Sequence, residues 1–228
     1  MTIYSKSVLS WGEYIDYELD GYESEPILEG GYSKLVQFLA KSMEGKVTMN
    51  MSQKVTKINW NGDLAVVRTE SGLAFDADYV ILALPLGVLK ETHMSLFEPR
   101  LPQQKMEIIE HLGFGVMDKI FLEFEEAFWD TENPGIQLVM TDIDYHDEDL
   151  ANAWQNHIAG FDGVCGQPNV LCGWVCGEPA RTMETLSEEE VKQTCWSLLR
   201  KYVGDTTPCP KYCKVSSWGS NKLFRGKN

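Results

Sequence analysis

The sequence contains a continuous apolar run, YVILAL at Tyr79–Leu84, that limits the folds open to this chain. A strand without polar alternation is typical of a sheet that is covered on both faces, as in a parallel sheet between helices. Pro85 follows directly and is expected to end the strand. The run therefore predicts a mixed α/β chain, with a sheet domain that contains this strand.

The residues before this run predict a helix and a small group of strands. Gly30-Gly31 precedes a helix that Ser33 could cap and that Gly45 should end. Its apolar residues fall at helical spacing: Leu35, Phe38, Leu39 and Met43. Strands are expected at Val47–Met51, Val55–Trp60 and Leu64–Thr69, followed by a short return segment at Phe75. Asn61-Gly62 predicts a tight hairpin between the second and the third of these strands.

The pattern changes after Lys90 and predicts a mixed sheet with helices packed on it. Pro102–Leu112 is expected to be a helix. Val116–Phe124 alternates, with Val116, Ile120, Leu122 and Phe124 on one face and Met117, Lys119, Phe121 and Glu123 on the other. Ser187 and Glu190 form a capping-box pattern before a helix with Val191, Cys195, Leu198 and Tyr202 on one face. Further strands are predicted at Ile136–Met140, Asn169–Cys176 and Tyr212–Ser217.

Charge and cysteine usage exclude several classes of protein. The 34 acidic and 20 basic residues give a net charge of −14, which argues against a nucleic-acid partner and favours cations. Acidic residues gather at Glu13–Glu29 and Asp142–Asp149, where solvated loops or the mouth of a polycation site are both open readings. The six cysteines form no CxxC pair, so we expect reduced thiols and no metal site. No signal peptide or membrane span is visible, which predicts a cytoplasmic protein, with a peroxisomal location as the alternative.

Familiar phosphate-binding and hydrolase motifs are absent from the sequence. Gly113-Phe114-Gly115 lacks the third glycine of a dinucleotide fingerprint and precedes a strand rather than a helix. No Walker loop, GxSxG or HExxH occurs.

Several segments, in order along the chain, are similar to one known family. GFGVMDKIFLEFEEAFW at Gly113–Trp129 resembles the strand that carries the active-site lysine of FAD-dependent polyamine oxidases. YVILALPLGVLK at Tyr79–Lys90 resembles the strand and turn before the substrate domain of the same enzymes. Three more segments match the family: VTKINW at Val55–Trp60, METLSEEEV at Met183–Val191 and SSWGSNKLFRG at Ser216–Gly226. WGEY at Trp11–Tyr14 resembles a segment at the edge of the substrate cavity in these enzymes. The chain thus resembles the central section of the flavin amine oxidase family, nearest to N1-acetylpolyamine and spermine oxidases.

The resemblance implies roles for four residues, each beside an ordinary structural alternative. Lys119 matches the catalytic lysine that holds a water against the flavin; otherwise it is an exposed strand lysine. Val55 and Trp218 match cofactor-binding positions near the adenine and the flavin ring; otherwise they are core residues. Glu13 matches a substrate-binding carboxylate near the polyamine path; otherwise it is a solvated loop acid.

The same resemblance implies a division of the chain and an activity. An irregular acidic segment is expected at residues 1–29, part of a Rossmann-like FAD-binding domain at 30–90, a substrate-binding domain at 91–217 and the start of a second FAD-binding segment at 218–228. The implied reaction is flavin-dependent oxidation of a polyamine to a shorter polyamine, an aldehyde and hydrogen peroxide. Because the family's two ends are missing, we do not expect this chain alone to bind FAD tightly. A non-catalytic module that binds polyamines or a protein, and a histone-demethylase relative, remain the alternatives.

Overall fold

The computed structural model describes residues 31–132, 134–139 and 153–225. Within these residues the chain forms two compact units, one built from residues 31–35 and 115–220 and the other from residues 36–114 and 221–225. Each unit has its own sheet and its own buried core. The acidic segments at Glu13–Glu29 and Asp142–Asp149 lie outside the described residues.

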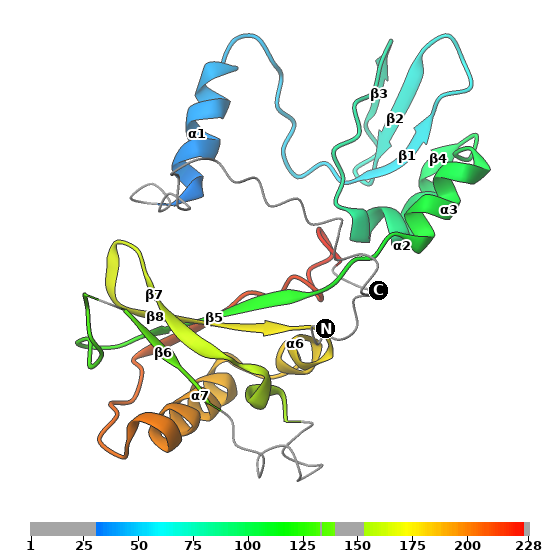
Figure 1. Ribbon diagram of the computed structural model, residues 1–228. Coiled ribbons are helices and arrows are strands. Elements are labelled where there is room, and N and C mark those ends of the chain that lie inside the picture. The colour runs from blue at the N-terminus through cyan, green and yellow to red at the C-terminus, as the bar shows by residue number, and fades with distance from the viewer. Residues whose placement is uncertain (1–30, 133, 140–152, 226–228) are drawn as a thin grey trace, which may run out of the picture. The chain divides into compact units, whose positions relative to one another are not determined.

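The larger unit contains a five-stranded sheet in the order β6-β7-β8-β5-β9 (Figure 1). All four strand pairs are antiparallel, whereas the sequence had predicted mixed pairing in this part of the chain. The glycine-containing β7 had not been predicted, and the predicted Ile136–Met140 strand is the short β6, with Met140 outside the described residues. The strands are β5 (Met117–Glu123), β6 (Gly135–Gln137), β7 (Gly160–Val164), β8 (Gln167–Cys176) and β9 (Tyr212–Val215).

The predicted alternation along Val116–Phe124 is confirmed. Val116, Ile120, Leu122 and Phe124 are buried in the larger core, while Met117 and Glu123 are exposed. Each fully buried aliphatic or aromatic side chain contributes about 1.5–3 kcal/mol to stability through the hydrophobic effect. The alternation therefore fixes which face of β5 packs inward, and so which face carries Lys119.

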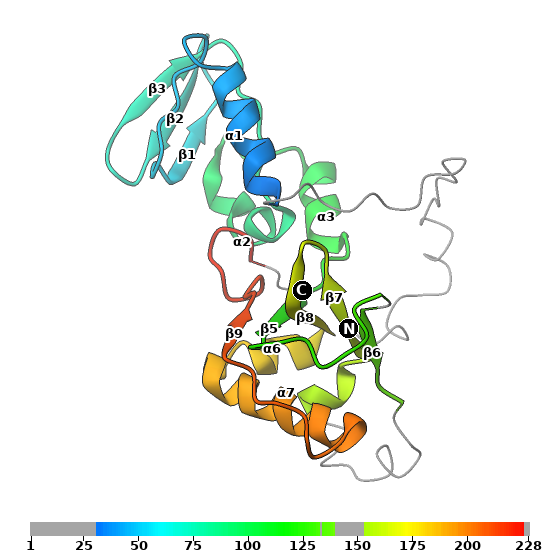
Figure 2. The same ribbon diagram turned by 90° about the vertical axis from the view of Figure 1, so that its left-hand side faces the viewer.

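Helices cover the buried face of this sheet (Figures 1 and 2). They are α6 (Glu178–Met183), α7 (Glu188–Val203) and the 3-10 turn η3 (Trp154–His157). The predicted capping box is present, since Ser187 Oγ accepts from Glu190 N and the Glu190 carboxylate accepts from Ser187 N. Three glutamates in the first turn and two basic residues in the last turn complement the helix dipole. Val191, Cys195 and Leu198 are buried as the spacing had predicted, which anchors α7 on the sheet.

The smaller unit contains a four-stranded sheet in the order β3-β2-β1-β4, with β1 and β4 parallel. The predicted hairpin at Asn61-Gly62 is confirmed by the antiparallel pairing of β1 and β2. The predicted helix at Pro102–Leu112 is also confirmed as α3, which begins just after Pro102. The elements are β1 (Val55–Asn59), β2 (Ala65–Thr69), β3 (Ala74–Ala77), α2 (Leu86–Leu96), β4 (Phe97–Glu98) and α3 (Gln103–His111).

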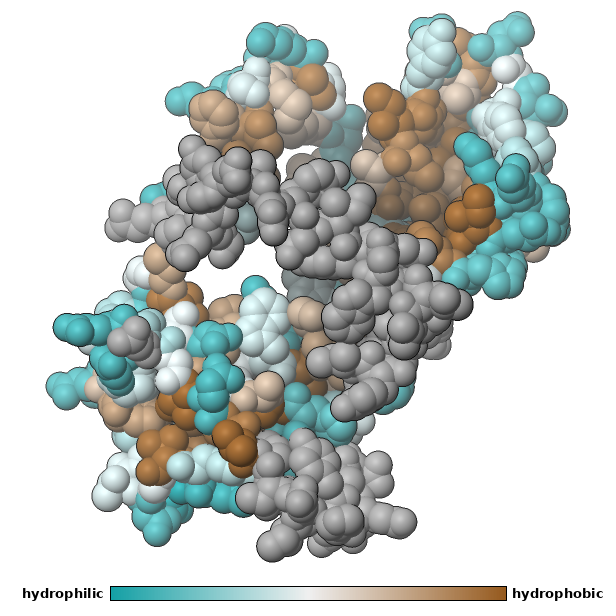
Figure 3. Space-filling model, viewed as in Figure 1, coloured by the Kyte–Doolittle hydropathy of each residue, from teal (hydrophilic) through white to brown (hydrophobic). Residues whose placement is uncertain are grey.

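Two predicted strands of this unit are absent. Tyr79–Leu84 forms no strand, and Tyr79 and Ile81 are 89% and 94% exposed rather than covered on both faces. Val47–Met51 also forms no strand. An apolar run becomes a strand only where neighbouring strands satisfy its backbone, and the described residues provide none for these two segments. Hydrophobic side chains consequently gather on the surface of this unit (Figure 3).

The first described helix, α1 (Tyr32–Ser42), follows Gly31 as predicted and is succeeded by Gly45 with a positive φ. Ser33 lies inside the helix rather than before it. The apolar residues that the sequence places at helical spacing are not covered by other described residues, since α1 contains no buried residue.

The described cysteines are all free thiols. Cys172 and Cys195 are buried, as expected for core thiols, and Cys176 is half-buried. Burial raises the pKa of Cys172 to about 11, so this thiol stays protonated at neutral pH. No helix within the described ranges has the length and apolar character needed to cross a membrane.

Candidate functional site

Lys119 lies in the middle of β5, on the face of the larger sheet opposite the buried core. Seven consecutive residue pairs join β5 to β8, and Lys119 is paired with Trp174. The Lys119 Nζ lies 4.2 Å from the centroid of the Trp174 ring, within the range of a cation–π contact. Because β5 has a paired strand on each side, the position of this lysine is set by the sheet and not by a loop.

The surroundings of Lys119 are partly apolar. Phe121 lies two pairs along β5 from Lys119, opposite Cys172 on β8, and is half-buried. Trp174 keeps 38% of its surface exposed. The surface around Lys119 thus combines one cation with aromatic side chains, an arrangement that can bind a flat or extended organic group.

The neighbouring Asp118 points to the opposite, buried face and has no exposed surface. Its Oδ1 accepts a hydrogen bond from Ser216 Oγ at 2.8 Å and another from the Trp218 backbone N at 3.0 Å. Ser216 Oγ in turn accepts from the Lys119 backbone N at 2.8 Å, and Ser216 N donates to the Lys119 carbonyl at 2.9 Å. Asp118 therefore ties the segment after β9 to the strand that carries Lys119.

Sequence reasoning had missed Asp118, although a signal was present. In the alternation of Val116–Phe124, position 118 falls on the same face as Val116 and Ile120, so a carboxyl group there has to be buried. Buried carboxyl groups are rare unless they are paired, and their pKa values are often perturbed at functional sites. Burial, followed by the contact with Glu184, raises the pKa of Asp118 from 3.8 to about 6.

Glu184 is the second acidic residue at this place. It follows α6 and accepts hydrogen bonds from two successive backbone groups, Gly219 N to Oε1 at 2.6 Å and Ser220 N to Oε2 at 2.7 Å. A Cβ atom at Gly219 would come within 3.0 Å of both carboxylate oxygens, so this close approach depends on glycine. Asp118 and Glu184 together hold residues 216–220.

The other residues predicted from the sequence have different positions. Trp218 is 44% exposed, and its backbone N–H donates to Asp118 on β5 at 3.0 Å. Val55 is half-buried at the start of β1 and packs against the core of the smaller unit. Glu13 lies outside the described residues. The structure therefore brings Lys119 and the Trp218 segment together, and Val55 belongs to the other unit.

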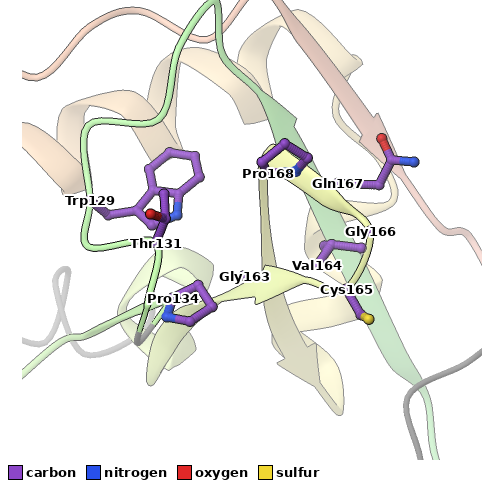
Figure 4. A pocket seen from close by; sticks show the side chains of 9 residues that line it. All are labelled: Trp129, Thr131, Pro134, Gly163, Val164, Cys165, Gly166, Gln167 and Pro168. Carbon is purple, nitrogen blue, oxygen red and sulfur yellow. The ribbon is translucent and has the colours of Figure 1, made fainter.

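A small cavity of about 280 Å³ lies elsewhere on the larger unit (Figure 4). Thr131 and Pro134 line one side of it, and Cys165 and Gly166 at the β7–β8 turn line the other. None of the residues predicted for the site lines this cavity. Ligand pockets usually have about 300–1,000 Å³, so a group as large as FAD does not fit here. Within the described residues no cluster of acidic, histidine and cysteine side chains could hold a metal ion.

The sequence pattern of one family, flavin containing amine oxidoreductase, matches residues 4–228. The chain belongs to this family. Human peroxisomal N(1)-acetyl-spermine/spermidine oxidase is 36% identical to this chain in an alignment of 225 positions that covers 90% of the chain and 44% of the human protein. Histone demethylase-like protein A of Aspergillus fumigatus is 32% identical over 96% of the chain and 21% of that protein.

Solved structures agree with the family's fold. A putrescine oxidase bound to putrescine superposes with a TM-score of 0.60 at 22% identity, covering 87% of this chain and 41% of that one. The mixed α/β fold class expected from the sequence is thereby confirmed. The amine oxidoreductase chain spans less than half the length of these relatives.

Proposed function

We propose that this chain takes part, within a larger enzyme, in the FAD-dependent oxidation of N1-acetylpolyamines or spermine to a shorter polyamine, an aldehyde and hydrogen peroxide. Membership of the flavin-containing amine oxidoreductase family supports the reaction class. The human relative's name supports the substrate class. The observation that carries the proposal is the position of Lys119, which the sheet presents beside an aromatic ring on the face opposite the core.

In this proposal Lys119 is the catalytic residue and Trp174 limits the positions that its ammonium can adopt. The flavin supplies the redox chemistry when it is bound. The one cavity described above is too small for a flavin and contains none of the predicted site residues, so we derive no step through the cofactor. Val55 and Trp218 remain proposed cofactor contacts, and Glu13 a proposed substrate contact. We also propose a cytoplasmic location. The name of the human relative suggests the peroxisome as the alternative.

A chimera tests the proposed role of Lys119. We expect that human N1-acetyl-spermine/spermidine oxidase whose matched section is replaced by this chain produces hydrogen peroxide from an N1-acetylpolyamine. Lys119→Met in this chimera should lower kcat at least about 100-fold, because a positioned proton-handling or hydrogen-bonding side chain contributes about that much to catalysis. Peroxide formation and bound-flavin absorbance are the measurements.

The matched control is Lys214→Met in the same sheet. Lys214 lies on the edge strand β9, is 77% exposed and pairs with Glu188 at 2.8 Å, so its loss should change kcat less than about twofold. A chimera that binds flavin but forms no peroxide would contradict the proposed function. Equal losses in the two lysine variants would contradict the role of Lys119.

A second candidate is a non-catalytic module that binds polyamines or a protein through an acidic surface. The net charge of −14 favours it, together with the absence of a dinucleotide fingerprint from the sequence. The two candidates differ in what the isolated chain binds.

We expect the purified 228-residue chain to carry no flavin absorbance and to form no peroxide from spermine, because its sequence contains no dinucleotide fingerprint and spans 44% of the human relative's length. Absorbance spectra of the chain as purified, and after addition of FAD, check this expectation. Tightly bound flavin would contradict it. Calorimetry with spermine separates the candidates, since heat of binding without flavin supports the non-catalytic module and its absence at millimolar spermine counts against it.

A further inference from the structure

Asp118 and Glu184 both form hydrogen bonds with the same short segment, residues 216–220. The two residues come from different elements, β5 and the end of α6, yet both direct their hydrogen bonds to residues 216–220. Asp118 accepts from Ser216 and from the backbone of Trp218, and Glu184 accepts from the next two backbone N–H groups. Four donors within residues 216–220, one hydroxyl and three backbone N–H groups, are thus bound by two carboxyl groups.

One of the two carboxylate oxygens of Asp118 takes no part in these hydrogen bonds. Asp118 Oδ2 is buried and has no hydrogen-bond partner among the described residues. A buried, unpartnered carboxylate oxygen is costly, because burial removes the water that would otherwise solvate it. The neighbouring carboxyl of Glu184 can become its partner only if one of the two groups carries a proton, since ionised carboxylates accept but do not donate.

The charges around the pair favour such a proton. The contact with Glu184 raises the pKa of Asp118 further, after the larger effect of burial. On β8 the Cys176 thiol lies next to Val175, the pairing partner of Asp118, and its pKa is raised by burial and to a lesser degree by Asp118. From the segment after β9 the groups that face Asp118 are the neutral Ser216 hydroxyl and the Trp218 N–H. Among the described residues no ion pair involves Asp118 or Glu184.

We propose that Asp118 and Glu184 share one proton and act as positioning residues, forming a carboxyl clasp that holds residues 216–220 and thereby fixes Trp218 relative to the strand that carries Lys119. Its importance for amine oxidation rests on the proposed function, but the clasp itself does not. With the proton present, Asp118 Oδ2 and Glu184 attract each other. Without it, the two carboxylates repel, and the segment with Trp218 is held less firmly.

The clasp can affect the position of Lys119 because Asp118 and Lys119 lie on opposite faces of β5. Lys119 and Asp118 are adjacent residues, so one points to the open face and the other to the core. Any movement of Ser216 is transmitted to Lys119 directly, because Ser216 bonds the Lys119 backbone on both its N–H and its carbonyl side. A neutral side chain could provide the same acceptors, but only a carboxyl pair makes the position of Trp218 depend on pH.

The clasp can be tested without any activity measurement. The full chain is labelled with 5-fluorotryptophan, and the Trp218 resonance is assigned by its loss in Trp218→Phe. We expect the ¹⁹F resonance of Trp218 to move with pH, with a midpoint near 6, the pKa of Asp118. In Asp118→Asn the amide keeps an acceptor for Ser216 and Trp218 and offers Glu184 a permanent donor. Its resonance should therefore stay near the low-pH position of the wild type throughout the titration.

Two further variants keep the test decisive. Glu184→Gln removes the second charge and should move the midpoint below 6 without abolishing it, because burial still raises the pKa of Asp118. It replaces Asp118→Asn if that variant fails to fold. Asp162→Asn, an exposed strand aspartate of the same sheet, is the matched control and should leave the titration unchanged. A Trp218 resonance that does not respond to pH in the wild type overturns the clasp, and so does one that titrates identically in Asp118→Asn. Neither result depends on whether the parent enzyme oxidises polyamines.

Discussion

Replacing Phe124 by alanine is expected to lower the free energy of unfolding of the larger unit by about 3–5 kcal/mol. Phe124 directly follows β5, is 1% exposed and lies among the inward-facing residues of the main core. Its ring contacts Phe128 and Trp129 edge to face, at centroid distances of 5.0 and 5.5 Å. The substitution removes apolar area from the core, leaves a cavity and breaks both aromatic contacts.

Phe121→Ala is the matched control for this prediction. The same change of residue is made on the same strand, but Phe121 lies on the open face and is only half-buried. We expect a loss of about 1 kcal/mol there, because less apolar surface returns to water and no closed cavity forms. Urea unfolding of the full chain, followed by near-ultraviolet circular dichroism, measures both. Equal losses would show that the open face of the sheet is as tightly packed as the core, contrary to the structure.

The elements that the sequence predicted well are those whose signals are local. β5 is specified by its own alternation, and α7 by its capping box and the spacing of Val191, Cys195 and Leu198. The first hairpin is specified by Asn61-Gly62 at its turn. In each case the residues that determine the conformation lie within one strand or a few helical turns, so no distant partner has to be known.

The incorrect or missing predictions concern contacts between distant parts of the sequence. Tyr79–Leu84 has the composition of a covered strand, but a strand also needs neighbours, and the described residues supply none. β7 contains two glycines and pairs through its backbone, which composition does not reveal. The same limit explains the site: Lys119 could be named from a family motif, whereas Asp118 and Glu184 become a pair only when β5 and the end of α6 are brought together.

The free energy of unfolding is expected to depend on pH through Asp118, and this is the second of the two largest predicted effects. We predict that, relative to Asp118→Asn, the wild-type chain loses at most about 3 kcal/mol of unfolding free energy between pH 4 and pH 7. Burial and the contact with Glu184 raise the pKa of Asp118 from 3.8 to about 6 in the folded chain. A tenfold change in proton affinity corresponds to about 1.4 kcal/mol, which gives this upper value.

The direction follows from proton linkage. Between pH 4 and pH 6 the folded chain holds a proton on Asp118 that the unfolded chain has released, so raising the pH favours unfolding. The stabilisation from the Asp118 proton is complete below the pKa of this residue in the unfolded chain. It is lost as the pH rises through the pKa of Asp118 in the folded chain. Glu188 acts in the opposite sense, because its hydrogen bond with Lys214 lowers its pKa and its contribution is lost as the pH falls. Both chains contain Glu188, so its effect cancels in the comparison.

The comparison of the two chains is therefore more informative than either profile alone. Asp118→Asn cannot ionise, so its stability should exceed that of the wild type at pH 7 and approach it near pH 4. Asp162→Asn should follow the wild-type profile at every pH, because that exposed side chain is not part of the clasp. Urea unfolding at half-unit pH intervals gives the three curves. If Asp118→Asn is less stable than the wild type at pH 7, the ionised carboxylate is itself the stabilising form, and a shared proton between Asp118 and Glu184 is excluded.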